Sequence, residues 1–153
     1  LNRDFNLVCF GGGPLNDDEI SFISKLGLNG HVCQVGGDDC TLGDLYRGAS
    51  LFVYPSVYEG FGIPPLEAMS VGCPVACANS SSIPEVCGKS VDYFDPLDID
   101  SIKLSLTRVL GDSKYSETLA VAGIAQAENF SWSKCAIDTL KCYQLALDSQ
   151  KSS

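Results

Sequence analysis

Two glutamates and the glycines between them are the residues of this chain whose types and spacing could do chemistry. Glu59 and Glu67 stand eight positions apart, the first before a glycine-rich turn and the second inside the first turn of an expected helix. Carboxylates accept hydrogen bonds from hydroxyls, and Gly60 and Gly62 allow backbone angles and close approaches that side chains would forbid. We therefore expect both carboxylates to face one small concavity.

The glycine turn leads into a helix start, which is a second chemical feature. We expect this helix at about residues 65–71, because Pro65 suits the first helical position, where the missing N–H costs nothing. Backbone N–H groups at a helix N-terminus form a ready anion site. Residues 51–75 therefore predict a polyol-phosphate pocket, with amides for the phosphates and carboxylates for the hydroxyls.

Composition limits the other classes of protein. The 153 residues fit one domain, expected at 1–148 with a frayed tail at 149–153. A formal net charge of −9 with only ten Lys and Arg argues against nucleic-acid binding, which needs clustered basic residues. No apolar run approaches the ~20 residues of a membrane span, and residues 1–13 lack the pattern of a signal peptide. A cytoplasmic protein is expected.

The cysteines and the histidine do not form a metal-binding pattern. Eight cysteines include no C-x-x-C pair, and His31 is the one histidine. Cys9 and Cys77 lie inside apolar runs, where a free cysteine behaves as a small hydrophobic residue. We predict buried, reduced thiols in a reducing compartment and no metal cofactor, and we interpret Asp38 and Asp39 as a turn.

Short apolar runs alternate with helical patterns along the chain. Strands are expected at residues 6–10, 31–35, 51–54, 74–78 and 91–94. Helices are expected at 18–26 with Asp17 as N-cap, at 41–49 with a capping box from Thr41, and at 65–71, 98–110, 113–128 and 133–147. This alternation predicts an α/β fold, a Rossmann-like parallel sheet with helices on both faces. Ligands then lie beyond the carboxyl ends of the strands.

Two segments of this pattern have specific expectations. The last helix is expected to turn one face inward and Trp132 to be a packing anchor; that face carries Ile137, Leu140, Tyr143 and Leu147. The polar segment 79–85 follows the strand beside residues 51–54. Either its hydroxyls and amides open onto the same crevice as the glutamates, or it is a solvated turn followed by a short helix.

A longer run surrounds the two glutamates: Tyr54-Pro55-Ser56, EGFGIPPLEAM at 59–69, and Gly72-Cys73-Pro74-Val75. It resembles the signature of group 1 retaining glycosyltransferases, the glycogen-synthase-like family with a two-domain GT-B fold. Pro84-Glu85-Val86, Phe94-Asp95-Pro96 and Phe130-Ser131-Trp132 match the family in order and spacing. The resemblance covers residues 6 to 147 and implies sugar transfer from a nucleotide diphosphate donor to an acceptor hydroxyl with retention, without a metal.

The resemblance also implies roles for the residues of the run. Glu59 would contact the donor sugar's hydroxyls as the catalytic residue, and Glu67 would accept hydrogen bonds from the ribose. The amides of residues 60–62 would lie against the sugar and diphosphate, and those of 63–66 would face phosphate. The implied substrate-binding set is Gly60, Phe61, Gly62, Ile63, Pro64, Leu66 and Glu67. The alternatives are a solvated loop acid for Glu59 and a helix-dipole and capping role for Glu67.

The chain departs from the family pattern before residue 6. From the resemblance we expect that residues 1–153 do not include the family's N-terminal acceptor domain or the first strand-helix unit of the donor domain with its Arg and Lys. The missing strand would be the central one, so the chain must close the gap, associate with another chain or stay partly unfolded. A non-catalytic binding or assembly module is the alternative function, and a sugar-nucleotide epimerase ranks lower. The intact enzyme could sit at the cytoplasmic face of a membrane.

Overall fold

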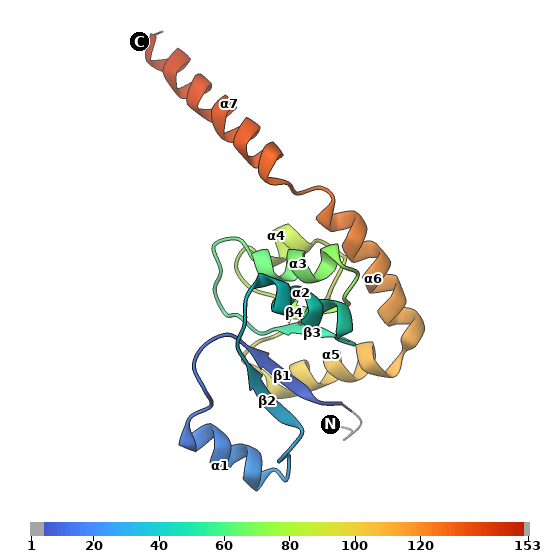
Figure 1. Ribbon diagram of the computed structural model, residues 1–153. Helices are drawn as coiled ribbons and strands as arrows, with labels where there is room; N and C mark the ends of the chain where they lie inside the picture. Colours follow the sequence, from blue (N-terminus) through green and yellow to red (C-terminus); the bar gives the residue numbers. More distant parts are fainter. Residues whose placement is uncertain (1–4, 152–153) are drawn as a thin grey trace.

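The computed structural model describes residues 5–151, in which strands and helices alternate as far as the fifth strand and three helices follow (Figure 1). The strands are β1 (Leu7–Phe10), β2 (Val32–Val35), β3 (Phe52–Tyr54), β4 (Val75–Ala78) and β5 (Asp92–Phe94). The helices are α1 (Asp17–Lys25), α2 (Asp39–Gly48), α3 (Ile63–Ser70), α4 (Ile83–Cys87), α5 (Ile99–Gly111), α6 (Ser113–Ala127) and α7 (Trp132–Lys151). The predicted α/β fold with parallel strands is confirmed.

The strands form two parallel sheets rather than one. β1 pairs with β2 through Leu7 opposite Val32, and β4 lies between β3 and β5. A six-stranded doubly wound sheet has the order 3-2-1-4-5-6, and the present order, β2-β1 and then β3-β4-β5, matches it with one central position empty. No strand pairing joins the two sheets among the described residues, and Leu7 and Val8 of β1 are 54% and 41% exposed.

The core lies in the second sheet and the helices around it. All four residues of β4 are buried, and α3 contributes Ala68 and Met69. α6 approaches α3 closely at Gly123, where an added Cβ would lie 3.0 Å from Met69 Cγ. In contrast, α1 has no buried residue, and Phe22 is 63% exposed. The part of the chain that can hold a site rigidly is therefore the part after β3.

Two helix starts differ from the prediction because a polar residue further upstream provides the cap. Asn16 rather than Asp17 caps α1, in a reciprocal capping box with Glu19. Asp38 caps α2, because its carboxylate accepts hydrogen bonds from the N–H and hydroxyl of Thr41 at 3.0 and 2.9 Å. Asp38 is thus a cap and not only a turn residue, and the predicted capping box at Thr41 is wrong.

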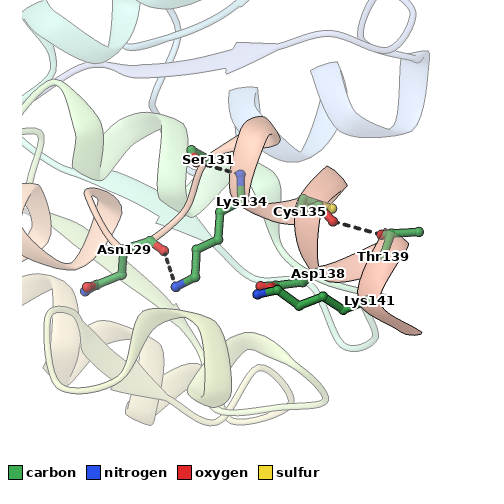
Figure 2. Close-up of polar contacts among 7 residues, drawn as sticks. All are labelled: Asn129, Ser131, Lys134, Cys135, Asp138, Thr139 and Lys141. Carbon is green, nitrogen blue, oxygen red and sulfur yellow. Dashed lines mark hydrogen bonds and ion pairs between the residues drawn. The ribbon is translucent and has the colours of Figure 1, made fainter. Parts of the chain in front are cut away.

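The prediction for the last helix is wrong in its burial. α7 extends away from the rest of the molecule (Figure 1), so the face expected to turn inward is exposed: Trp132 79%, Ile137 54%, Leu140 65%, Tyr143 63% and Leu147 55%. Its first turns are held by local contacts, in which Ser131 Oγ accepts from the Lys134 N–H and Lys134 Nζ donates to the Asn129 carbonyl (Figure 2). The segment predicted as a frayed tail is helical as far as Lys151, and residues 152–153 lie outside the described residues.

The cysteine prediction holds in part. All eight cysteines are free, and Cys73, Cys77 and Cys87 are buried, but four others are exposed: Cys33, Cys40, Cys135 and Cys142. Burial fails for these four because two lie on α7 and two in the loosely packed first part of the chain. Within residues 5–151, no helix is long and apolar enough to cross a membrane.

A buried ion pair joins β5 to α5. The side chain of Asp92 is 1% exposed and accepts two hydrogen bonds from Arg108, from Nε and Nη2, both at 2.6 Å. Ser105 Oγ donates a third at 3.0 Å. A bidentate arginine–carboxylate pair of this kind is among the stronger side-chain interactions, and it fixes β5 against α5.

We predict that Arg108→Ala lowers the free energy of unfolding by about 2 kcal/mol, because it leaves the Asp92 carboxylate buried without a cation. The loss is smaller than for a fully buried pair, since Arg108 is 49% exposed. Urea denaturation measures it. The control is Arg47→Ala, which breaks an exposed pair with Asp44 and should cost below about 0.5 kcal/mol. Equal losses in the two variants would contradict this role of Asp92.

Candidate functional site

The carboxylate of Glu59 is held in one orientation by two hydroxyl groups. Tyr54, the last residue of β3, and Ser56 both donate to its Oε1, Ser56 at 2.8 Å. Among the described residues, none donates a hydrogen bond to Oε2. Glu59 is therefore a positioned carboxylate with one oxygen available to a ligand, which disfavours the solvated loop acid.

The same contacts fix the ionisation of the pair. The hydrogen bond from Tyr54, followed by that from Ser56, holds the pKa of Glu59 below its usual range. Burial, followed by the hydrogen bond to Glu59, raises the pKa of Tyr54 to about 12. At neutral pH the glutamate is therefore charged and the tyrosine remains a donor.

The three serines at 80–82 hold the backbone of the Glu59 loop. Their hydroxyls donate to the carbonyls of Ser56 at 2.9 Å, of Glu59 at 2.7 and 3.0 Å, and of Phe61 at 3.0 Å. Each expectation for segment 79–85 is therefore partly met. The segment lies beside the loop of Glu59, and its last residues begin the short helix α4. The serine hydroxyls, however, bind the loop and are not free in a crevice.

Gly62 turns the loop into α3. It is the N-cap residue, is buried and has a φ of +104°, which non-glycine residues adopt at a cost. α3 begins at Ile63, two residues earlier than predicted, because the whole first turn tolerates proline. Pro64 and Pro65 carry no N–H, so among residues 63–66 the backbone donors are those of Ile63 and Leu66.

Glu67 lies one turn further along α3 than expected. No acidic residue occupies the first turn of this helix, which disfavours a capping role. The hydroxyl of Tyr46, on α2, donates to Glu67 Oε2 at 3.3 Å. Both side chains line a hollow of about 190 Å³ between α2 and α3. Glu59 does not line this hollow, so the expected single concavity for both carboxylates is not formed there.

Three aromatic rings connect the two carboxylates. The rings of Tyr46 and Phe52 meet edge to face at 5.0 Å between centroids, and those of Phe52 and Tyr54 are stacked at 5.9 Å. Burial, followed by the charge of Glu67, raises the pKa of Tyr46. These tyrosines were not predicted from the sequence as partners of Glu59 and Glu67. The available signal was the tyrosine among the apolar residues of the helix expected at 41–49, because a buried tyrosine hydroxyl usually needs a partner.

Of the other predicted site residues, Ile63, Pro64 and Leu66 lie in α3, where Leu66 packs against the core, and Gly60 and Phe61 lie in the loop before it. Gly60 is exposed, and Phe61 is 46% exposed. The ring of Phe61 packs edge to face on Phe130 at 5.8 Å, so two of the matched motifs are in contact. Residues 5–151 contain no group of three or more His, Cys, Asp and Glu side chains that could hold a metal ion.

A family model described as "Glycosyl transferases group 1" matches residues 1–126. The chain belongs to this family. A similar relative, O-antigen chain mannosyltransferase B from Escherichia coli, is 48% identical over 101 residues, which are 66% of this chain and 26% of that protein. MMP alpha-(1->4)-mannosyltransferase from Mycolicibacterium hassiacum is 32% identical over 152 residues, 96% of this chain and 37% of that protein. The matched parts of this chain therefore span about a quarter of one relative and more than a third of the other.

Solved glycosyltransferase structures have the same fold. Sucrose-phosphate synthase from Thermosynechococcus elongatus superposes with a TM-score of 0.77 at 20% identity, over 97% of this chain and 47% of that one. Anabaena Alr3699/HepE, solved in complex with UDP, gives 0.73 at 20% identity, over 97% and 41%. The GT-B resemblance of the fold is confirmed, and the glycosyltransferase chain corresponds to less than half of each neighbour.

We predict that Tyr54→Phe raises the pKa of Glu59 toward its usual range, because the variant loses the main donor to the charged form. NMR titration of the Glu59 carboxyl measures the shift. Because the pKa of Glu59 is lower in the folded chain than in the unfolded chain, the charged carboxylate stabilises the fold at neutral pH. This stabilisation is lost as the pH falls below the unfolded-state pKa, about 4.3. The variant has less of it and should therefore lose less stability on acidification. Tyr58→Phe, at an 83% exposed ring, is the control. An unchanged pKa in Tyr54→Phe would contradict the assignment.

We predict that Gly62→Ala destabilises the fold by about 1–2 kcal/mol through its positive φ. An added Cβ would meet only Ile83 Cγ1 at 3.8 Å, so the cost is conformational and not steric. Gly60→Ala is the matched control, because no atom lies within 4 Å of its added Cβ and its φ is not positive. Thermal unfolding compares the two variants. A fully stable Gly62→Ala would show that the loop does not need the left-handed residue.

Proposed function

We propose that this chain supplies the donor site of a retaining glycosyltransferase, which moves a sugar from a nucleotide diphosphate to an acceptor hydroxyl. The observation that carries the proposal is the fixed state of both motif glutamates. A tyrosine hydroxyl holds one carboxylate oxygen of Glu59 and of Glu67, and the other oxygen is left for a ligand. Positioned acceptors of this kind bind hydroxyls without first having to be ordered.

In this proposal the two glutamates have different ligands. Glu59 accepts hydrogen bonds from the sugar, and Glu67, in the hollow between α2 and α3, accepts them from the ribose. The amides of residues 60–62 and of Ile63 and Leu66 face the diphosphate. The bond from the anomeric carbon to the diphosphate breaks as the bond to the acceptor oxygen forms, and the proton of the acceptor hydroxyl passes to the leaving diphosphate. Fixed N–H donors stabilise the charge that develops on the leaving diphosphate.

We propose a mannose nucleotide as the first donor to test, because two similar relatives are named mannosyltransferases. Retention is proposed from the signature at residues 54–75. The reaction is proposed to need no metal, to take place in the cytoplasm and to require an acceptor domain from the rest of the intact enzyme. The coverage of the relatives, 26% and 37%, supports this last point.

Calorimetric titration of the chain with GDP-mannose, and with guanosine, uridine and adenosine diphosphates, tests the proposal. We expect saturable binding of at least one nucleotide, weakened about tenfold or more by Glu67→Ala, because hydrogen bonds to a charged group are lost. Glu117→Ala, an exposed glutamate on α6, should bind as the original chain does.

Two results would count against the donor site. If none of the nucleotides binds to a folded sample, the alternative of a non-catalytic binding or assembly module is favoured. If nucleotides bind but Glu67→Ala leaves the affinity unchanged, Glu67 has no ribose role and the site lies elsewhere.

A further inference from the structure

A second hollow lies at the carboxyl ends of β4 and β5. Its volume of about 490 Å³ is within the roughly 300–1,000 Å³ range of small-molecule sites. It is separate from the hollow that contains Glu67 but adjoins the Glu59 loop, which provides part of its wall. It is lined by Val57, Asn79, Ser80, residues 93–97 and Ser101.

Three polar groups in this hollow have hydrogen-bonding capacity that the fold does not use. In the described part of the chain, the exposed side-chain amide of Asn79 has no partner. Asp95 Oδ1 accepts from the Leu97 N–H at 2.9 Å, which leaves Oδ2. Ser101 Oγ accepts from the Asp95 N–H at 3.0 Å, which leaves its hydroxyl hydrogen to donate. The hollow therefore offers an amide, a carboxylate oxygen and a hydroxyl.

Apolar side chains form the rest of the surface. Val57 and Leu97 are 56% and 82% exposed, and Phe94 is buried behind them. A sugar ring has hydroxyls at its edge and C–H groups on its faces, so it matches a wall of mixed character. A phosphate does not, because no lysine or arginine lines the hollow and Asp95 would repel an anion. A divalent cation would need more oxygen ligands than one carboxylate offers.

We propose that this hollow binds a neutral pyranose unit of the acceptor glycan. The assignment rests on the proposed function, because a transferase needs an acceptor next to its donor; this hollow would bind one unit of a glycan whose remaining units contact the proposed acceptor domain. The hydrogen bond from Ser80 Oγ to the Ser56 carbonyl, 2.9 Å long, ties the wall of the hollow to the loop that positions Glu59. A sugar held here lies beside the loop at which the donor sugar is proposed to bind, and Asn79, Asp95 and Ser101 contribute to acceptor specificity.

NMR titration of the ¹⁵N-labelled chain with methyl α-D-mannopyranoside, up to about 100 mM for a weak site, tests the assignment. We expect saturable shifts of the Asn79, Asp95 and Ser101 amides. Asn79→Ala and Asp95→Asn should each weaken binding about tenfold. The asparagine keeps an Oδ1 acceptor for the Leu97 N–H, so the turn is retained. The control is Asp100→Asn. Asp100 is an exposed acid on α5, next to Ser101, and it does not line the hollow, so this variant should bind the mannoside normally.

Titration of the same samples with guanosine diphosphate separates the two proposals. We expect Asn79→Ala and Asp95→Asn to bind the nucleotide within about twofold of the original chain, since neither residue belongs to the donor site. If the mannoside site behaves as expected but no nucleotide binds, the donor proposal fails and the sugar site stands. If no saturable mannoside shift occurs, if the shifts lie around Glu59 or Glu67 and not at Asn79, Asp95 and Ser101, or if both variants bind the mannoside normally, this inference is overturned.

Discussion

The hydrogen bond from Tyr54 to Glu59 is the interaction on which the rest of the site depends. Glycine turns are flexible, and a carboxylate on such a turn would sample many orientations. Tyr54 ends a strand that packs on the core, so its hydroxyl is a fixed point to which the loop is attached. The serines at 80–82 attach the backbone of the same loop to the end of β4. Two neighbouring strands thus hold one acid.

Glu67 is held in a parallel way, and the two arrangements are joined through Phe52. Tyr46 and Tyr54 contact this ring from different elements, and each donates to a different glutamate. Buried tyrosine hydroxyls suit this task, because burial raises their pKa and keeps the proton in place. The site is therefore ordered before a ligand arrives, and ordering lowers the entropic cost of binding.

The sequence was sufficient for the local features that repeat a simple physical rule. Apolar runs predicted the strands to within one residue, and the glutamates and Gly62 were found from residue type and spacing. The contacts of Tyr46 with Glu67 and of the serines at 80–82 with the Glu59 loop could not be found this way, because these residues come together only through tertiary packing. The exposure of α7 was missed because periodicity predicts an apolar face but not what covers it. Similarly, the sequence predicted parallel strands in a doubly wound pattern, but not that they form two separate sheets.

We propose that Glu59 and Glu67 bind the two sugars of one nucleotide sugar, although Glu59 does not line the hollow that contains Glu67. A crystal structure of the chain with GDP-mannose tests this most directly. The account predicts that Glu59 Oε2 accepts a hydrogen bond from the mannose and Glu67 from the ribose, with the Tyr54 and Tyr46 contacts retained. A bound nucleotide sugar that contacts neither carboxylate, or that displaces Tyr54 from Glu59, would contradict it.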